Sequence, residues 1–133
     1  MEQRKLSEEE VVSFRTNGVV KVSGAVDPSW IPELLAVADG QLTKPSKWVN
    51  DVNAGASENR LFTDRYLWRH NDVIHRFVHD SGCARLAAQA MSSNSARFYF
   101  DHLLIKKVNT RTITPWLTSA EVQPLLRQAL AHR

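Results

Sequence analysis

The segment from residue 96 to residue 108 constrains the fold more than any other part of the chain. Its side chains alternate between the two faces of a strand, and both faces carry large apolar groups. One face holds Phe98, Phe100, His102, Leu104 and Lys106, and the other holds Arg97, Tyr99, Asp101, Leu103 and Ile105. The pattern predicts a strand buried on both faces. Because only 25 residues follow it, we expect one face poorly covered and a strand edge open to self-association.

Helix start signals organise the chain upstream of this strand. Ser7 and Glu10 form a capping box, which predicts a helix over residues 8–17 that ends at Gly18. The β-branched residues 19–23 predict a short strand. A helix over residues 30–42 follows. Its expected inward residues are Ile31, Leu34, Leu35 and Ala38.

The remaining segments complete an α+β class. We expect a long loop over residues 43–60, anchored by Trp48 and Val49, and then an extended segment over residues 61–68. Asn71 caps a helix over residues 72–80, and a second helix runs to Met91. A further capping box predicts a helix over residues 118–132. Helices packed on a few strands are therefore the expected architecture.

Composition narrows the functional classes. The 133 residues suit one domain, and the single cysteine, Cys83, fits a reducing, cytoplasmic setting. The sequence contains no run of 18 apolar residues, so it predicts no membrane-spanning helix. Residues 1–82 carry 10 Lys/Arg and 12 Asp/Glu, whereas residues 83–133 carry 7 and 2. The basic side chains of the second part are scattered along the sequence, so we expect no nucleic-acid partner.

Two weak site signals lie in the middle of the chain. His75 and His79 have the spacing of metal ligands on a helix, but Arg76 stands where an HExxH motif has glutamate. We favour an exposed polar face over a metal site. Cys83 could be a nucleophile at a helix start, but a small buried side chain is the favoured interpretation.

The strongest motif is residues 97–106 followed by Thr114, Pro115 and Trp116. It resembles the phytanoyl-CoA dioxygenase family of Fe(II)/2-oxoglutarate oxygenases. In that family an aromatic strand ends in Asp-(Gln/His)-Leu-x-x-Lys and leads to Thr-Pro-Trp-His-Gln-Asp. Residues 14–22, 61–68 and 77–88 resemble its earlier segments, so the likeness covers about residues 8–116. It implies an incomplete double-stranded β-helix (jelly roll) in residues 1–116, a non-matching helix in residues 117–133, and hydroxylation of an unactivated C–H bond in a small molecule.

The chain departs from the family where the iron ligands should begin. Leu117 and Ser119 occupy the positions of the His and Asp ligands, and the later candidates are only His132 and Arg133. The 2-His-1-carboxylate triad is therefore missing. We expect no catalytic or metal-binding residue, and we expect this chain to bind neither Fe(II) nor 2-oxoglutarate although the family uses both. His102 alone is carried over toward 2-oxoglutarate, with a core histidine as the alternative.

Three functional hypotheses remain open from the sequence. The chain is an oxygenase portion shortened or rearranged after Trp116 and inactive alone, or a non-catalytic binding or regulatory module derived from that family. The third, an enzyme of another class, lacks any complete set of catalytic residues, and no nucleotide-binding or nucleophile-elbow motif occurs.

Overall fold

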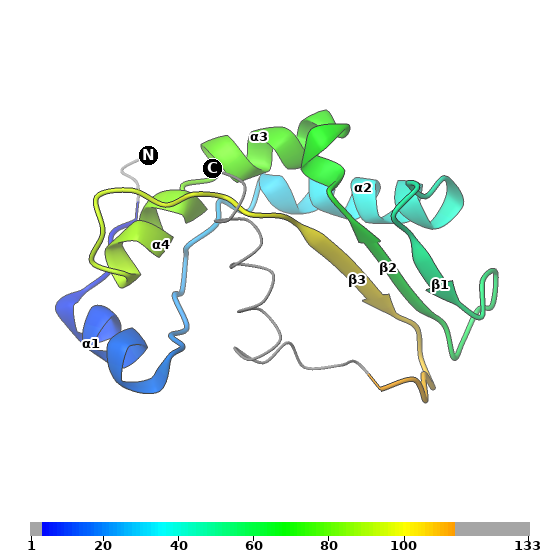
Figure 1. The fold of residues 1–133 in the computed structure, drawn as a ribbon, viewed down its shortest axis with the longest axis horizontal. Helices are drawn as coiled ribbons and strands as arrows, with labels where there is room; N and C mark the ends of the chain where they lie inside the picture. Colours follow the sequence, from blue (N-terminus) through cyan, green and yellow to red (C-terminus); the bar gives the residue numbers. More distant parts are fainter. Residues whose placement is uncertain (1–3, 114–133) are drawn as a thin grey trace, which may run out of the picture.

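The computed structural model describes residues 4–113, and the chain is α+β (Figure 1). The predicted helix over residues 118–132, the Thr114-Pro115-Trp116 motif and the proposed boundary at residue 117 lie outside the described residues. The elements follow the order α1 (Glu8–Asn17), α2 (Trp30–Thr43), β1 (Asn50–Val52), β2 (Leu61–Arg65), η1 (Leu67–Arg69), α3 (Asp72–Asp80), α4 (Cys83–Ala90) and β3 (His102–Lys106).

The strands form one antiparallel sheet in the order β1-β2-β3. β2 is the central strand, and its register pairs Phe62 with Ile105 and Arg65 with His102. Phe62 is completely buried because it faces the helical layer. Its neighbours on the same face, Asp64 and Leu103, are also buried or half-buried.

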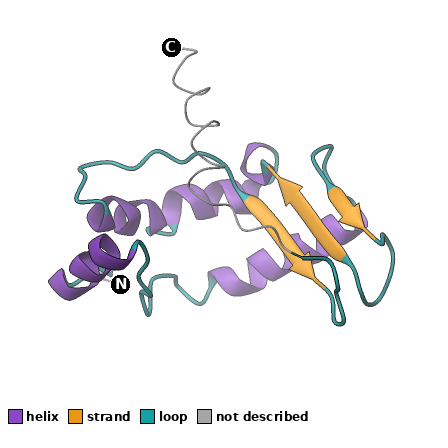
Figure 2. Cartoon of the chain, turned by 60° about the horizontal axis from the view of Figure 1, so that its bottom comes forward, coloured by secondary structure: helices purple, strands orange, loops and turns teal. Residues whose placement is uncertain are grey.

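Helix α2 lies on one side of this sheet. Figures 1 and 2 show α2 running behind the sheet, and Ser46, just after α2, donates its backbone N–H to Asp64 at 2.8 Å. The opposite face carries His102, Leu104 and Lys106, which are exposed. Leu61 lies on the same face but is buried. It is at the end of the sheet where residues 107–110 form hydrogen bonds with Asn59 and Arg60. The residues that the structure describes form no second sheet over this face.

The first helix confirms its predicted limits. Ser7 Oγ accepts from the backbone N–H of Glu10, and the Glu10 carboxylate accepts from the N–H of Ser7. Gly18 ends α1 with φ +73°, which glycine adopts at little cost. The predicted strand over residues 19–23 is wrong. Val19 is 68% exposed, and in the described residues no strand pairs with this segment.

The next two segments are partly as predicted. α2 begins at the predicted Trp30 and ends at Thr43. However, Ile31 and Leu35 are exposed, and Val37 is the buried residue of the helix. The expected loop over residues 43–60 contains β1, because residues 50–52 pair with β2.

The caps of α3 and the break before α4 agree with the sequence. Asn71 Oδ1 accepts from the N–H groups of Val73 and Ile74 at 3.1 Å. Gly82, with φ +84°, separates α3 from α4. Among the described residues, no helix is long and apolar enough to cross a membrane.

The predicted long strand is shorter than expected. β3 spans only His102–Lys106, and the aromatic residues before it are not in a strand. The reason lies in β2, which stops at Arg65, since Tyr66 has φ +61° and turns the chain into η1. The expected burial on both faces is also wrong: Phe98 is 42% and Tyr99 46% exposed.

Candidate functional site

His102 is the predicted cofactor residue, and it lies at the start of β3. We expected the side chain of His102 to point into the core. It lies instead on the uncovered face of the sheet, with Leu104. Arg65 is its partner across the ladder. Partial burial of the imidazole lowers the pKa of His102, and the nearby Arg65 cation lowers it further, against a smaller opposing effect of Asp101. His102 therefore favours its neutral form, which can accept a hydrogen bond or bind a metal.

Asp101, the acidic residue of the family-like motif, has a structural task in this fold. Its two carboxylate oxygens accept from the backbone N–H groups of Leu67 at 2.8 Å and Trp68 at 2.9 Å. The N–H of Tyr66 donates to the Asp101 carbonyl at 3.3 Å. These bonds tie η1 to the start of β3, and so they fix the chain on both sides of the His102–Arg65 pair.

An aromatic cluster formed by Trp48, Tyr66, Tyr99 and Phe100 adjoins this pair. Ring centroids lie 5.3 Å apart for Trp48–Tyr66, 5.9 Å for Tyr66–Phe100 and 5.0 Å for Tyr99–Phe100. The Lys47 ammonium sits 4.5 Å from the Trp48 ring centroid, in cation–π geometry. The sequence singled out Trp48 only as an anchor, because its partners come from segments about 20 and 50 residues further along.

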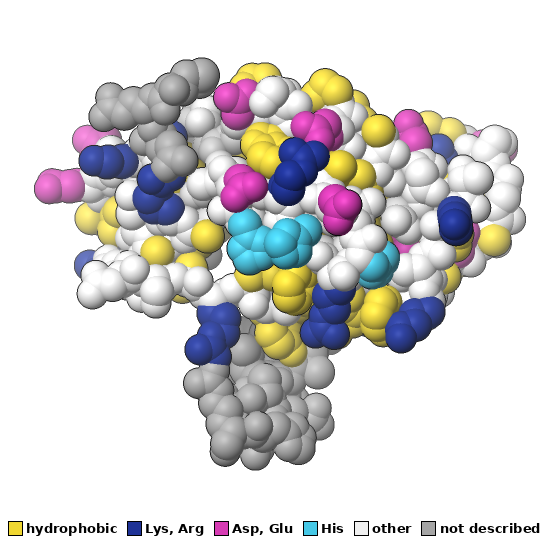
Figure 3. Space-filling view, turned by 90° about the horizontal axis from the view of Figure 1, so that it is seen from above, with side chains coloured by type: hydrophobic (Ala, Val, Ile, Leu, Met, Phe, Trp, Pro, Cys, Tyr) yellow, Lys and Arg dark blue, Asp and Glu magenta, His cyan; other side chains and the backbone are white. Residues whose placement is uncertain are grey.

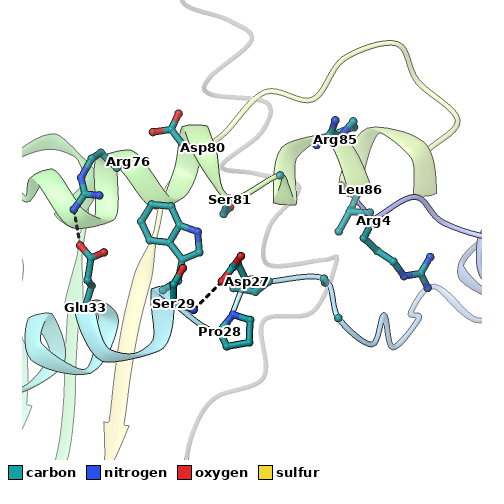
Figure 4. A pocket seen from close by; sticks show the side chains of 15 residues that line it. Arg4, Asp27, Pro28, Ser29, Glu33, Arg76, Asp80, Ser81, Arg85 and Leu86 are labelled. Carbon is teal, nitrogen blue, oxygen red and sulfur yellow. Dashed lines mark hydrogen bonds and ion pairs between the residues drawn. The ribbon is translucent and has the colours of Figure 1, made fainter. Parts of the chain in front are cut away.

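A hollow lies elsewhere, where α2 begins and α3 gives way to α4 (Figure 4). Its volume is about 730 Å³, and Trp30 and Leu86 supply apolar lining. Its Arg76 already pairs with Glu33 at 2.5 Å and stacks 5.5 Å over the Trp30 ring. Arg4 is likewise paired, with Glu10 at 2.5 Å. Because these charges satisfy one another, they do not converge on a ligand position.

The other singled-out residues are separate from both places. His75 and His79 are exposed on α3, as favoured from the sequence, and Figure 3 shows histidine side chains together on the face seen from above. Cys83 is a half-buried free thiol at the start of α4. Across residues 4–113, no group of three or more His, Cys, Asp or Glu side chains is placed to hold a metal ion.

Comparisons with protein-family models, curated proteins and solved structures returned no match.

Proposed function

We propose that this chain supplies the helix-backed sheet of an oxygenase-type double-stranded β-helix resembling the phytanoyl-CoA dioxygenase family, and that it is not catalytic by itself. The observation that carries the proposal is the one-sided cover of the sheet. In a double-stranded β-helix two sheets pack face to face. A sheet with helices on one face and exposed His102 and Leu104 on the other fits one half of that arrangement.

The residues around His102 fit the same proposal. The pair His102–Arg65 places a neutral imidazole beside a cation on the uncovered face. A carboxylate ligand such as 2-oxoglutarate suits that combination, since guanidinium groups bind carboxylates well. Asp101 preserves the position of the pair by holding η1 in place.

Catalysis needs more than this face provides. Fe(II) bound by two histidines and one carboxylate supplies the oxygen chemistry in such enzymes. Leu117 and Ser119 stand at the corresponding positions, and an aliphatic side chain cannot bind a metal. We therefore expect this chain to bring a sheet face and an anchoring histidine but not to turn substrate over.

A succinate assay tests this proposal. The chain is incubated with Fe(II), a reductant, O₂ and 2-oxoglutarate. We expect no succinate above a protein-free control, either for the natural sequence or for the Leu117→His, Ser119→Asp double variant, because a distal His and a carboxylate-binding Arg are also required. Multiple turnovers by the unaltered chain that are lost in His102→Ala would contradict the inactive state. They would also support an intact oxygenase.

The aromatic cluster favours one alternative, a non-catalytic small-molecule-binding module. Rings of Trp48, Tyr66 and Phe100 beside the cation of Lys47 suit a flat, anionic ligand. Under this alternative such ligands quench tryptophan fluorescence in a saturable way, and Trp48→Leu removes the response. A matched Trp30→Leu variant, altered in the separate hollow, keeps it. The oxygenase proposal alone predicts no such selectivity for Trp48.

A further inference from the structure

Two imidazoles stand side by side on the exposed face of α3. The ring centroids of His75 and His79 are 4.6 Å apart and their planes meet at 47°. Both residues are exposed. On the opposite face of α3, Ile74 and Phe77 are half-buried. A spacing of four residues places the two side chains one helical turn apart on the same face. The pair is therefore accessible to solvent and close enough to share one ion.

The surrounding side chains hold this pair in place. The Trp68 ring stacks on His75 with centroids 6.3 Å apart and an angle of 22°. Asn71 caps α3 with two hydrogen bonds, so the helical turn that carries the ligands begins from a fixed end. Arg76 lies between the histidines in sequence, but its guanidinium turns to Glu33 on α2 (Figure 4). Its positive charge is thus paired with a carboxylate on α2.

We propose that His75 and His79 chelate one divalent late transition-metal ion. Imidazole nitrogen is a ligand that Zn²⁺, Ni²⁺ and Cu²⁺ share, with bonds of about 2.0–2.1 Å to zinc. Two neutral nitrogens leave the other coordination positions to water. The site takes Cu²⁺ more tightly than Ni²⁺ or Zn²⁺, following the general order of affinities. It binds more weakly than four-ligand structural zinc sites, and it is independent of the oxygenase proposal.

Equilibrium dialysis of the full chain against Ni²⁺ or Cu²⁺ tests the site. We expect the tightest class of binding sites, the one with the lowest dissociation constant, to hold one ion per chain. We expect that constant to rise at least ten-fold in His75→Gln and in His79→Gln. His70→Gln is the matched control: His70 is an exposed histidine that stacks on Trp48 instead of on another histidine. Its removal should leave the affinity unchanged.

Spectroscopy of the copper-loaded chain provides a second readout. We expect two nitrogen ligands in the electron paramagnetic resonance spectrum, and quenching of tryptophan fluorescence that falls most in Trp68→Phe while the metal still binds. Circular dichroism of the metal-free variants checks that the helices persist. Equal affinity in wild type, His75→Gln and His79→Gln, or a spectrum with one nitrogen ligand, would overturn the proposal.

Discussion

The carboxylate groups of Asp64 and Asp101 accept hydrogen bonds from backbone and hydroxyl donors. Asp64 is fully buried, and its carboxylate accepts from the N–H groups of Ser46 and Arg65 at 2.8 Å and from the Ser46 hydroxyl. A buried carboxylate is tolerated when it is hydrogen-bonded in this way. Both acids are therefore committed to the fold, and the His102–Arg65 pair is the part of this region whose polar groups still face outward.

The pKa of His102 is the residue-scale prediction. It lies below the ordinary value of 6.5 because of partial burial and the Arg65 cation. Replacing Arg65→Gln removes the second cause, so the pKa should rise but stay below its ordinary value. A titration followed by NMR of the imidazole protons measures it, with Lys106→Gln as a matched loss of charge on the same face. An unchanged pKa in Arg65→Gln would contradict the assigned cause.

The lowered pKa of His102 also predicts how the free energy of unfolding changes with pH. The folded-state pKa of His102 is lower than the unfolded one, so between the two values the unfolded chain binds more protons. The contribution of His102 to folding is therefore fully present above about pH 6.5 and declines as the pH falls below that value. In Arg65→Gln this decline should be smaller.

At the scale of elements, η1 is bonded to the side chain of Asp101, the residue just before β3. Replacing Asp101→Ala removes two acceptors and leaves the N–H groups of Leu67 and Trp68 without their protein partner. We expect the free energy of unfolding to fall by about 3–6 kcal/mol, since each of the two hydrogen bonds to a charged group contributes about 1.5–3 kcal/mol. Urea denaturation measures the change.

An exposed acid on another element provides the control for that experiment. Asp39 is exposed on α2, so Asp39→Ala should change the free energy of unfolding by no more than about 0.5 kcal/mol. A loss in Asp101→Ala as small as this would show that the Asp101 bonds do not hold η1.

Elements with local start and stop signals were predictable from the sequence. α1 and α3 carry their caps in Ser7 and Asn71, and Gly82 marks the break before α4. Strands were harder because a strand needs a partner that the local sequence does not specify. Residues 50–52 are polar at two of three positions yet pair with β2, while the β-branched residues 19–23 pair with nothing in the described part of the chain.

The candidate site was predictable in part. The motif around His102 marked a segment that does contain a strand, β3, but alternation alone could not say which face turns toward α2. The aromatic cluster was missed because Trp48, Tyr66 and Phe100 meet only after the positive φ of Tyr66 turns the chain at the end of β2. No local sequence pattern predicts that turn, since non-glycine residues rarely adopt a positive φ.

At the largest scale, the central feature of residues 4–113 is a sheet with helical cover on one face. β3 is an edge strand in the described residues, and Leu104 on its uncovered face is 40% exposed. Val108 and Ile113 are 71% and 84% exposed. Each large apolar side chain left in water forgoes about 1.5–3 kcal/mol of burial. Several of them rival the entire stability of a small domain, about 5–15 kcal/mol.

Sedimentation velocity across low micromolar concentrations tests the uncovered face most directly. We expect the natural chain to self-associate through β3 and its exposed face, because an unpaired edge with apolar side chains recruits a second strand. Leu104→Lys should shift the distribution toward monomer, while Val12→Lys, at a position on α1 that is 60% exposed against 40% for Leu104, should not. A monodisperse monomer of the natural chain with a sharp, high melting transition would contradict an uncovered sheet face.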